Sequence, residues 1–196
     1  MDLGINNRKA IVCASSRGLG EACAAALARE GALVVINSRN QADLDACAAR
    51  IEASTGHRPG TVVGDLTTDE GRRRLVEACP DADILVNNNA GPPPGQFADW
   101  DRAAWLNALD NNMLAPIFMI QALLPGMRAR KFGRIVNITS AMVKSPRPTM
   151  GLSTAARTGL TALCKSISHE VAPDNVTINN LLPERIDTGR QRYMAE

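Results

Sequence analysis

The sequence has few aromatic residues, and its histidines and cysteines form no recognisable ligand set. Only 3% of the 196 residues are aromatic, and the net charge is +2 with both signs mixed along the chain. This composition lacks the stacking platforms and basic stripes that bind nucleic acids. The five cysteines include no C-x-x-C pair, and there are only two histidines. That pattern argues against a zinc site or a disulfide framework and fits a reducing cytosol, so we expect neither a metal nor a nucleic-acid partner.

The chain also lacks a long apolar run. No uninterrupted apolar stretch approaches the roughly 20 residues that a membrane span needs, and the start, M-D-L-G-I-N-N-R-K, has no apolar signal core. We therefore expect a cytoplasmic protein with no membrane partner. Its hydrophobic content of 45% is enough for a single well-buried domain over residues 1–196.

The stretch Cys13–Gly20 reads C-A-S-S-R-G-L-G and is the strongest local signal. It follows the apolar run Ala10–Val12 and opens a segment with helical spacing. A strand, a glycine turn and a helix in this order bring backbone N–H groups and the helix dipole to a point where a phosphate can bind. Taken alone, Gly18 and Gly20 could also be turn glycines that let a helix pack close to a strand.

Apolar runs and helical patterns then alternate along the chain. Further strands are predicted at Ala32–Ile36, Thr61–Val63, Asp83–Val86, Arg134–Thr139 and Val176–Leu182. Helices are predicted at Asp43–Ser54, at Asp101–Arg130 with bends at Pro116 and Pro125, and at Ser153–Val171. A further helix is predicted to begin at a capping box formed by Thr67 and Glu70. Six strands alternating with five helices predict an α/β protein with a Rossmann-type, doubly wound parallel sheet, whose ligand lies beyond the carboxyl ends of the strands.

From about Lys9 to Thr188 the chain resembles the short-chain dehydrogenase/reductase family, and within it the 3-oxoacyl-ACP-reductase-like members. The motif T-G-x-x-x-G-x-G appears as Cys13-Ala14-x-x-x-Gly18-x-Gly20. N-N-A-G appears within Asn87–Gly91, starting at either Asn87 or Asn88. The resemblance implies a nicotinamide dinucleotide held by Ser15, Arg17, Gly18, Leu19, Gly20, Arg39, Asp65, Leu66, Asn88, Arg157, Ile186 and Thr188.

The resemblance further implies a small-molecule substrate and a homodimer or homotetramer. Family members continue into another helix and a seventh strand, which these residues lack, so the chain could be incomplete at its C-terminal end. The sixth strand is then expected at an open edge of the sheet. Near that end the family motif P-G-x-x-x-T reads Pro183 to Thr188, with Glu184 in place of glycine.

Cofactor choice follows from the end of the second strand. NAD-binding sites usually carry an acid there, which accepts the ribose 2′-hydroxyl, whereas a 2′-phosphate needs cationic donors. The segment Asn37–Asn40 contains no acid, and Arg17 and Arg39 could bracket a phosphate. We therefore predict that NADP(H) is preferred over NAD(H).

The catalytic segment departs from the family. The resemblance places a serine at Ser140 and an asparagine that orders a relay water at Asn112, but the expected tyrosine and lysine positions hold Ser153 and Arg157. Taken alone, Asn112 could equally be a polar residue that caps a local bend near Pro116. No Y-x-x-x-K exists, because the one tyrosine is Tyr193.

Arg157 could still hold the nicotinamide ribose, whereas a serine hydroxyl is far less acidic than a phenol. Three interpretations remain open. Hydride transfer could use another proton donor, namely Tyr193, Lys144 or a water ordered by Asn112 and Ser153. The domain could instead be an inactive NADP(H)-binding sensor or partner subunit. It could also catalyse a different reaction, in which Ser140 and Ser153 only orient the substrate.

Overall fold

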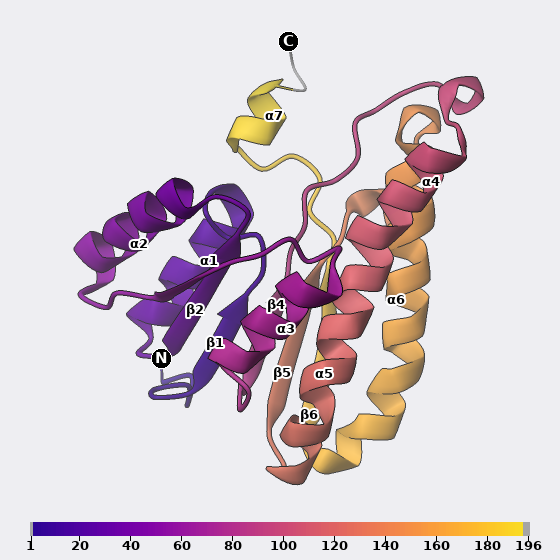
Figure 1. Ribbon diagram of the computed structural model, residues 1–196. Helices are drawn as coiled ribbons and strands as arrows, with labels where there is room; N and C mark the ends of the chain where they lie inside the picture. The colour runs from indigo at the N-terminus through magenta and orange to yellow at the C-terminus, as the bar shows by residue number, and fades with distance from the viewer. Residues whose placement is uncertain (1, 194–196) are drawn as a thin grey trace.

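A computed structural model describes residues 2–193 and contains a six-stranded parallel sheet (Figure 1). The strand order is β3-β2-β1-β4-β5-β6, so the order reverses between β1 and β4. The strands are β1 (Lys9–Val12), β2 (Leu33–Ser38), β3 (Gly60–Val63), β4 (Ile84–Asn87), β5 (Gly133–Ile138) and β6 (Val176–Leu181). The predicted strands and the predicted α/β fold class are confirmed, with bounds shifted by one or two residues.

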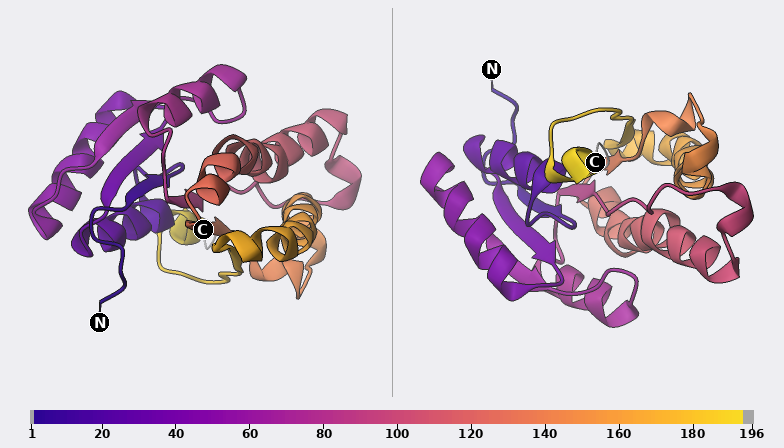
Figure 2. Two further views of the ribbon diagram at one scale, coloured as in Figure 1. Left: turned by 90° about the horizontal axis from the view of Figure 1, so that it is seen from below. Right: turned by 90° about the horizontal axis from the view of Figure 1, so that it is seen from above.

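Helices cover both faces of this sheet. On one face lie α1 (Gly18–Arg29) and α2 (Gln41–Thr55); on the other lie α3 (Asp69–Ala78), α5 (Ala115–Ala129) and α6 (Gly151–Val171). The helix α4 (Arg102–Leu109) precedes α5, and the short α7 (Gly189–Tyr193) follows β6. Seen from above, α7 lies between the α1–α2 half and the α5–α6 half of the molecule (Figure 2). It therefore sits over the carboxyl ends of the strands.

Alternate strand residues pack into two cores, one on each face of the sheet. Ala10 and Val12 of β1 belong to the core beneath α1 and α2, whereas Ile11 belongs to the core beneath α3, α5 and α6. All three are 0% exposed. A parallel strand covered on both faces must be apolar on both sides, which explains why these strands appear in the sequence as continuous apolar runs.

The predicted capping box at the start of α3 is wrong by one residue. The N-cap is Thr68, whose Oγ1 accepts a hydrogen bond from Gly71 N at 3.0 Å. Thr67 donates from its hydroxyl to Asp65 Oδ1 at 2.8 Å instead. Glu70 pairs with Arg74 at 2.6 Å rather than reaching back to the cap. The carboxylate of Asp65 therefore decides which of the two threonines is free to cap the helix.

The long helix predicted over Asp101–Arg130 is interrupted in the turn before Pro116. A π-helical turn at Asp110–Leu114 separates α4 from α5. Pro116 is the second residue of α5, directly after this turn, and Pro125 lies within α5. The break therefore comes before the proline, and it contains Asn112.

Within the part of the chain that the structure describes, β6 is an edge strand. Its residues Thr177, Asn179 and Leu181 are exposed. Across the sheet interior, Asn87 Nδ2 donates to Asn137 Oδ1 at 2.9 Å, and Asn137 Nδ2 donates to Asn180 Oδ1 at 3.0 Å. These bonds join β4, β5 and β6 by a row of amides. No helix among residues 2–193 has both the length and the apolar character needed to cross a membrane.

Candidate active site

The glycine loop between β1 and α1 turns through two residues in the left-handed region, Ala14 (φ 44°) and Gly18 (φ 61°). Ser15 is fully buried and stabilises this turn, because its hydroxyl donates to Val12 O at 2.6 Å and accepts from Asn37 N at 3.1 Å. The side chain of Ser15 thus positions the loop from within. The backbone of the loop is what faces the carboxyl edge of the sheet.

Ala14 stands where the backbone favours glycine. A non-glycine residue in the left-handed region costs about 1–2 kcal/mol relative to glycine. Part of this difference is offset because glycine loses more backbone entropy on folding than alanine does. We expect Ala14→Gly to raise the free energy of unfolding by about 1 kcal/mol, measured by urea denaturation. The control is Ala26→Gly, at an exposed position inside α1, which should lower it by about 1 kcal/mol. A destabilised Ala14→Gly variant would contradict the strain.

The amino end of α1 has no side-chain cap. Arg17 occupies the N-cap position and makes no capping hydrogen bond. By contrast, α2, α3 and α4 are capped by Asn40, Thr68 and Asp101. The first N–H groups of α1 are thus left to bind a ligand, and the end of a helix dipole favours an anion. This uncapped end fits the pyrophosphate of a dinucleotide.

The loop after β4 is tied to the glycine loop. Asn87 is the last residue of β4, and Asn88 is the first residue beyond it. Asn88 Nδ2 donates to Ala14 O at 2.9 Å. A Cβ on Gly20 would lie 2.7 Å from Ala14 O and 2.9 Å from Asn88 Nδ2. Helix α1 can approach β1 and β4 this closely only because residue 20 has no side chain.

The predicted adenine and phosphate residues follow β1, β2 and β3. Arg39 is 78% exposed, with Nη1 4.0 Å from Asp65 Oδ2, and Arg17 is exposed on the glycine loop. Burial raises the pKa of Asp65, but hydrogen bonds from Thr67 and the charge of Arg39 outweigh it and lower the pKa overall. Leu66 is buried in the core, which leaves its backbone as the part that can meet a ligand.

Sequence reasoning missed Arg50, which α2 brings to the glycine loop. Arg50 Nη2 donates to Ser16 O at 3.2 Å, and Nε pairs with Glu21 at 2.7 Å. These contacts fasten α2 to the start of α1. Nothing in the local pattern around Arg50 indicates them, because they arise only when the two helices pack together.

Of the predicted catalytic residues, Asn112 and Ser153 are buried and Ser140 is half-buried. Ser140 follows β5, and its Oγ accepts from Met142 N at 3.2 Å, which leaves the hydroxyl proton available. Asn112 Nδ2 donates to Ala108 O at 3.3 Å, whereas the buried Oδ1 has no partner among the described residues. A buried acceptor without a donor is unusual and marks a place for a water or a ligand group.

Arg157 lies one helical turn beyond Ser153 and is 8% exposed. Its Nη1 donates to Ile138 O at 2.6 Å and to Thr139 O at 3.1 Å, and its Nη2 donates to Asn89 O at 3.3 Å. Burial, and then the charge of Arg190, lower the pKa of Arg157 to about 10, so it stays charged at neutral pH. A full positive charge is therefore fixed between the ends of β4 and β5.

The segment after β6 crosses the glycine loop. The position of a Cβ on Gly18 is 3.8 Å from Thr188 Cγ2, while Ile186 is 48% exposed. Glu184 pairs with Arg147 at 2.5 Å, so its negative charge is matched by that guanidinium. The backbone of Tyr193 ends α7, but its side chain lies outside what the structure describes.

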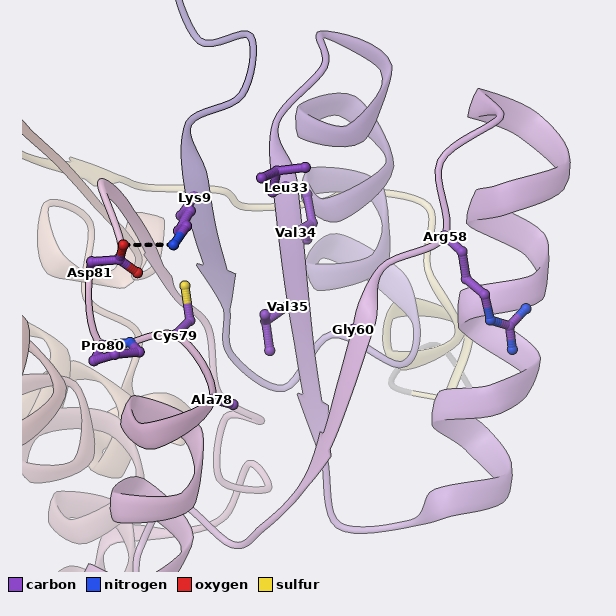
Figure 3. Close-up of a pocket in the computed structure, with 10 residues that line it drawn as sticks. All are labelled: Lys9, Leu33, Val34, Val35, Arg58, Gly60, Ala78, Cys79, Pro80 and Asp81. Carbon is purple, nitrogen blue, oxygen red and sulfur yellow. Dashed lines mark hydrogen bonds and ion pairs between the residues drawn. The ribbon is translucent and has the colours of Figure 1, made fainter.

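Two hollows lie away from these residues. One, of about 490 Å³, is at the amino ends of the strands and is lined by residues including Lys9, Leu33 and Arg58 (Figure 3). There Lys9 Nζ pairs with Asp81 at 2.6 Å. The other, of about 670 Å³, lies beside β6 and includes Lys144 and Lys165. Lys144 therefore lines the hollow beside β6. The hollow in Figure 3 is the first one, at the end of the sheet opposite the glycine loop.

An uncapped helix, a glycine loop and a reversal of strand order are the features at which proteins of the doubly wound α/β class bind nucleotides. Residues 8–196 match the family model of the short chain dehydrogenases. The chain belongs to this family of NAD(P)-dependent oxidoreductases.

Curated relatives and solved structures agree with that assignment. The chain is 35% identical over 193 residues to human dehydrogenase/reductase SDR family member 4, covering 96% of this chain and 69% of that protein. It is 34% identical to the uncharacterized oxidoreductase YvrD of Bacillus subtilis, covering 93% and 70%. The L-sorbose reductase of Gluconobacter frateurii, solved with NADPH and L-sorbose, superposes with a TM-score of 0.94 at 30% identity, covering 100% of this chain and 76% of that one.

Proposed function

We propose that this protein is an NADP(H)-dependent oxidoreductase that interconverts a small carbonyl compound and its alcohol, with Ser153 and Arg157 at the positions of the family tyrosine and lysine. The observation that carries the proposal is the uncapped amino end of α1 beneath a glycine loop, with the exposed Arg17 and Arg39 nearby. The structural relative from Gluconobacter frateurii binds NADPH and L-sorbose. A carbonyl or hydroxyl substrate that binds beyond the carboxyl ends of the strands is consistent with the uncapped helix end and with the ligands of this relative.

The bound dinucleotide would supply or accept the hydride. Ser140 would donate a hydrogen bond from its hydroxyl to the substrate oxygen, and the charge of Arg157 would favour negative charge developing there. Ser153 is too weak an acid to replace a phenol. A water bound to the unpartnered Asn112 Oδ1 would then carry the proton.

A second candidate is an inactive NADP(H)-binding sensor or partner subunit. It is favoured by one observation: the Nη groups of Arg157 donate to backbone carbonyls of β5 and of the loop after β4. Calorimetry with NADPH followed by a carbonyl-substrate screen separates the two candidates. Binding with turnover that Ser140→Ala abolishes supports the enzyme, and binding without turnover supports the sensor. No binding of NADPH contradicts both.

Cofactor preference is tested at Arg39. We expect Arg39→Gln to weaken NADPH binding by roughly tenfold or more and to leave NADH binding unchanged, because only NADPH carries the phosphate that a guanidinium would hold. Arg29→Gln, an exposed site in the last turn of α1, removes the same charge and should change neither affinity. Dissociation constants are measured by cofactor fluorescence. Equal weakening for both cofactors would overturn the assignment of Arg39 to the 2′-phosphate.

A further inference from the structure

Two arginines from distant parts of the chain converge on the loop after β4. A Cβ built on Gly91 would lie 3.3 Å from Arg190 Nη2 and 3.5 Å from Arg157 Nη2. Arg190 belongs to α7 and also donates to Pro92 O at 2.8 Å. Two guanidinium groups therefore approach the same few atoms of the loop, one from α6 and one from the segment after β6.

The guanidinium groups of Arg157 and Arg190 have no acidic partner within the described part of the chain. Among residues 2–193, no carboxylate lies within 4.0 Å of Arg157 or Arg190. The acids on the nearest segment are already engaged, since Glu184 pairs with Arg147 and Asp187 pairs with Arg192 at 3.1 Å. Like charges that approach the same point, one of them buried, favour the binding of an anion between them.

The donors of Arg157 are only partly used. Its Nη groups donate to three backbone carbonyls, but its Nε–H donates to none of the described residues. Arg190 is exposed and, among the described residues, donates only to the carbonyl of Pro92. Guanidinium groups bind carboxylates through paired N–H donors, which neutral carbonyl oxygens replace poorly. The pair thus keeps donors free, and those of Arg190 are exposed to solvent.

We propose that Arg157 and Arg190 bind a carboxylate of the substrate, so that the protein acts on a small hydroxy or oxo acid. Arg157 donates to Thr139 O, the carbonyl next to Ser140. The carboxylate would therefore lie beside the serine that holds the reacting oxygen, whereas the dinucleotide phosphates belong at the amino end of α1. This inference rests on the proposed function only in identifying the bound acid as the molecule that is oxidised or reduced.

The test compares acetoacetate, an oxo acid, with its neutral methyl ester by calorimetry at constant ionic strength. We expect the intact protein to bind acetoacetate roughly tenfold or more tightly than methyl acetoacetate. Arg190→Gln should remove that difference. Arg185→Gln removes the same charge from an exposed position on the same segment and should preserve it. Equal or absent binding of the acid, or an unaffected Arg190→Gln variant, would overturn the proposal.

NADPH is titrated into the same variants. If Arg190→Gln weakens NADPH binding and leaves acetoacetate binding unchanged, the pair serves a phosphate of the dinucleotide and the substrate assignment is wrong. The comparison of acid and ester is also made without NADPH, because the arginines converge in the protein alone. Failure of NADPH to bind would then contradict the proposed function, while the acid and ester still decide the role of the arginine pair.

Discussion

The double variant Ser153→Tyr/Arg157→Lys is expected to reduce ketones at least about a hundredfold faster than the natural protein. A positioned general acid contributes about 10²–10⁴ in rate, and a phenol is a far better proton donor than an aliphatic hydroxyl. Ser153 and Arg157 lie one turn apart on the buried side of α6, at 4% and 8% exposure. A tyrosine and a lysine there would share one environment, in which the ammonium charge lowers the pKa of the phenol.

The matched control is Ser153→Phe/Arg157→Lys, which has nearly the same bulk and charge but no hydroxyl. The ring replaces a small buried side chain, so each double variant should lose about 1–3 kcal/mol of stability. Thermal unfolding midpoints therefore accompany the rates. The rate is measured as NADPH consumed with acetoacetate and with diacetyl. If the tyrosine and phenylalanine variants are equally slow, the missing phenol is not what limits this site.

Most of the fold could be predicted because a parallel sheet covered on both faces demands apolar residues on both sides of each strand. The run Ala32–Ile36, for example, meets this requirement because its consecutive residues are all apolar. Exact helix starts are harder to predict. Thr67 and Thr68 are identical neighbours, and only the hydrogen bonds of Asp65 decide that Thr68 caps α3. The π-helical turn that contains Asn112 leaves no comparable pattern of spacing.

Residues of the candidate site that lie in one local segment could be predicted from the sequence. Residues that reach the site only through packing between distant segments could not. The glycine loop and Ser140 each follow a strand, so the topology alone brings them to one edge. Arg50 and Arg190 reach that edge from an ordinary helical surface and from the segment after β6. Their roles depend on which carbonyl each guanidinium meets, and no local spacing encodes such contacts between distant segments.

Gly20→Ala is expected to abolish tight NADPH binding, with a loss of affinity of about a hundredfold or more. The added Cβ would lie 2.7 Å from Ala14 O, 2.7 Å from Ser15 Cα and 2.9 Å from Asn88 Nδ2. Two of these atoms are backbone, and the third is held by its hydrogen bond to Ala14 O. Helix α1 must therefore move away from β1, which withdraws the N–H groups that would bind the phosphates.

The same displacement opens the core beneath α1, where Gly20 and Ala24 are buried, so the free energy of unfolding should fall by about 1–3 kcal/mol. Gly60→Ala is the control, because its Cβ would meet Val35 Cγ2 at an ordinary 3.5 Å at the opposite end of the sheet. Calorimetry with NADPH and urea denaturation measure both effects. The amino end of α1 cannot keep its position once residue 20 carries a side chain. A folded Gly20→Ala protein that binds NADPH normally would therefore show that cofactor binding does not depend on that end of α1.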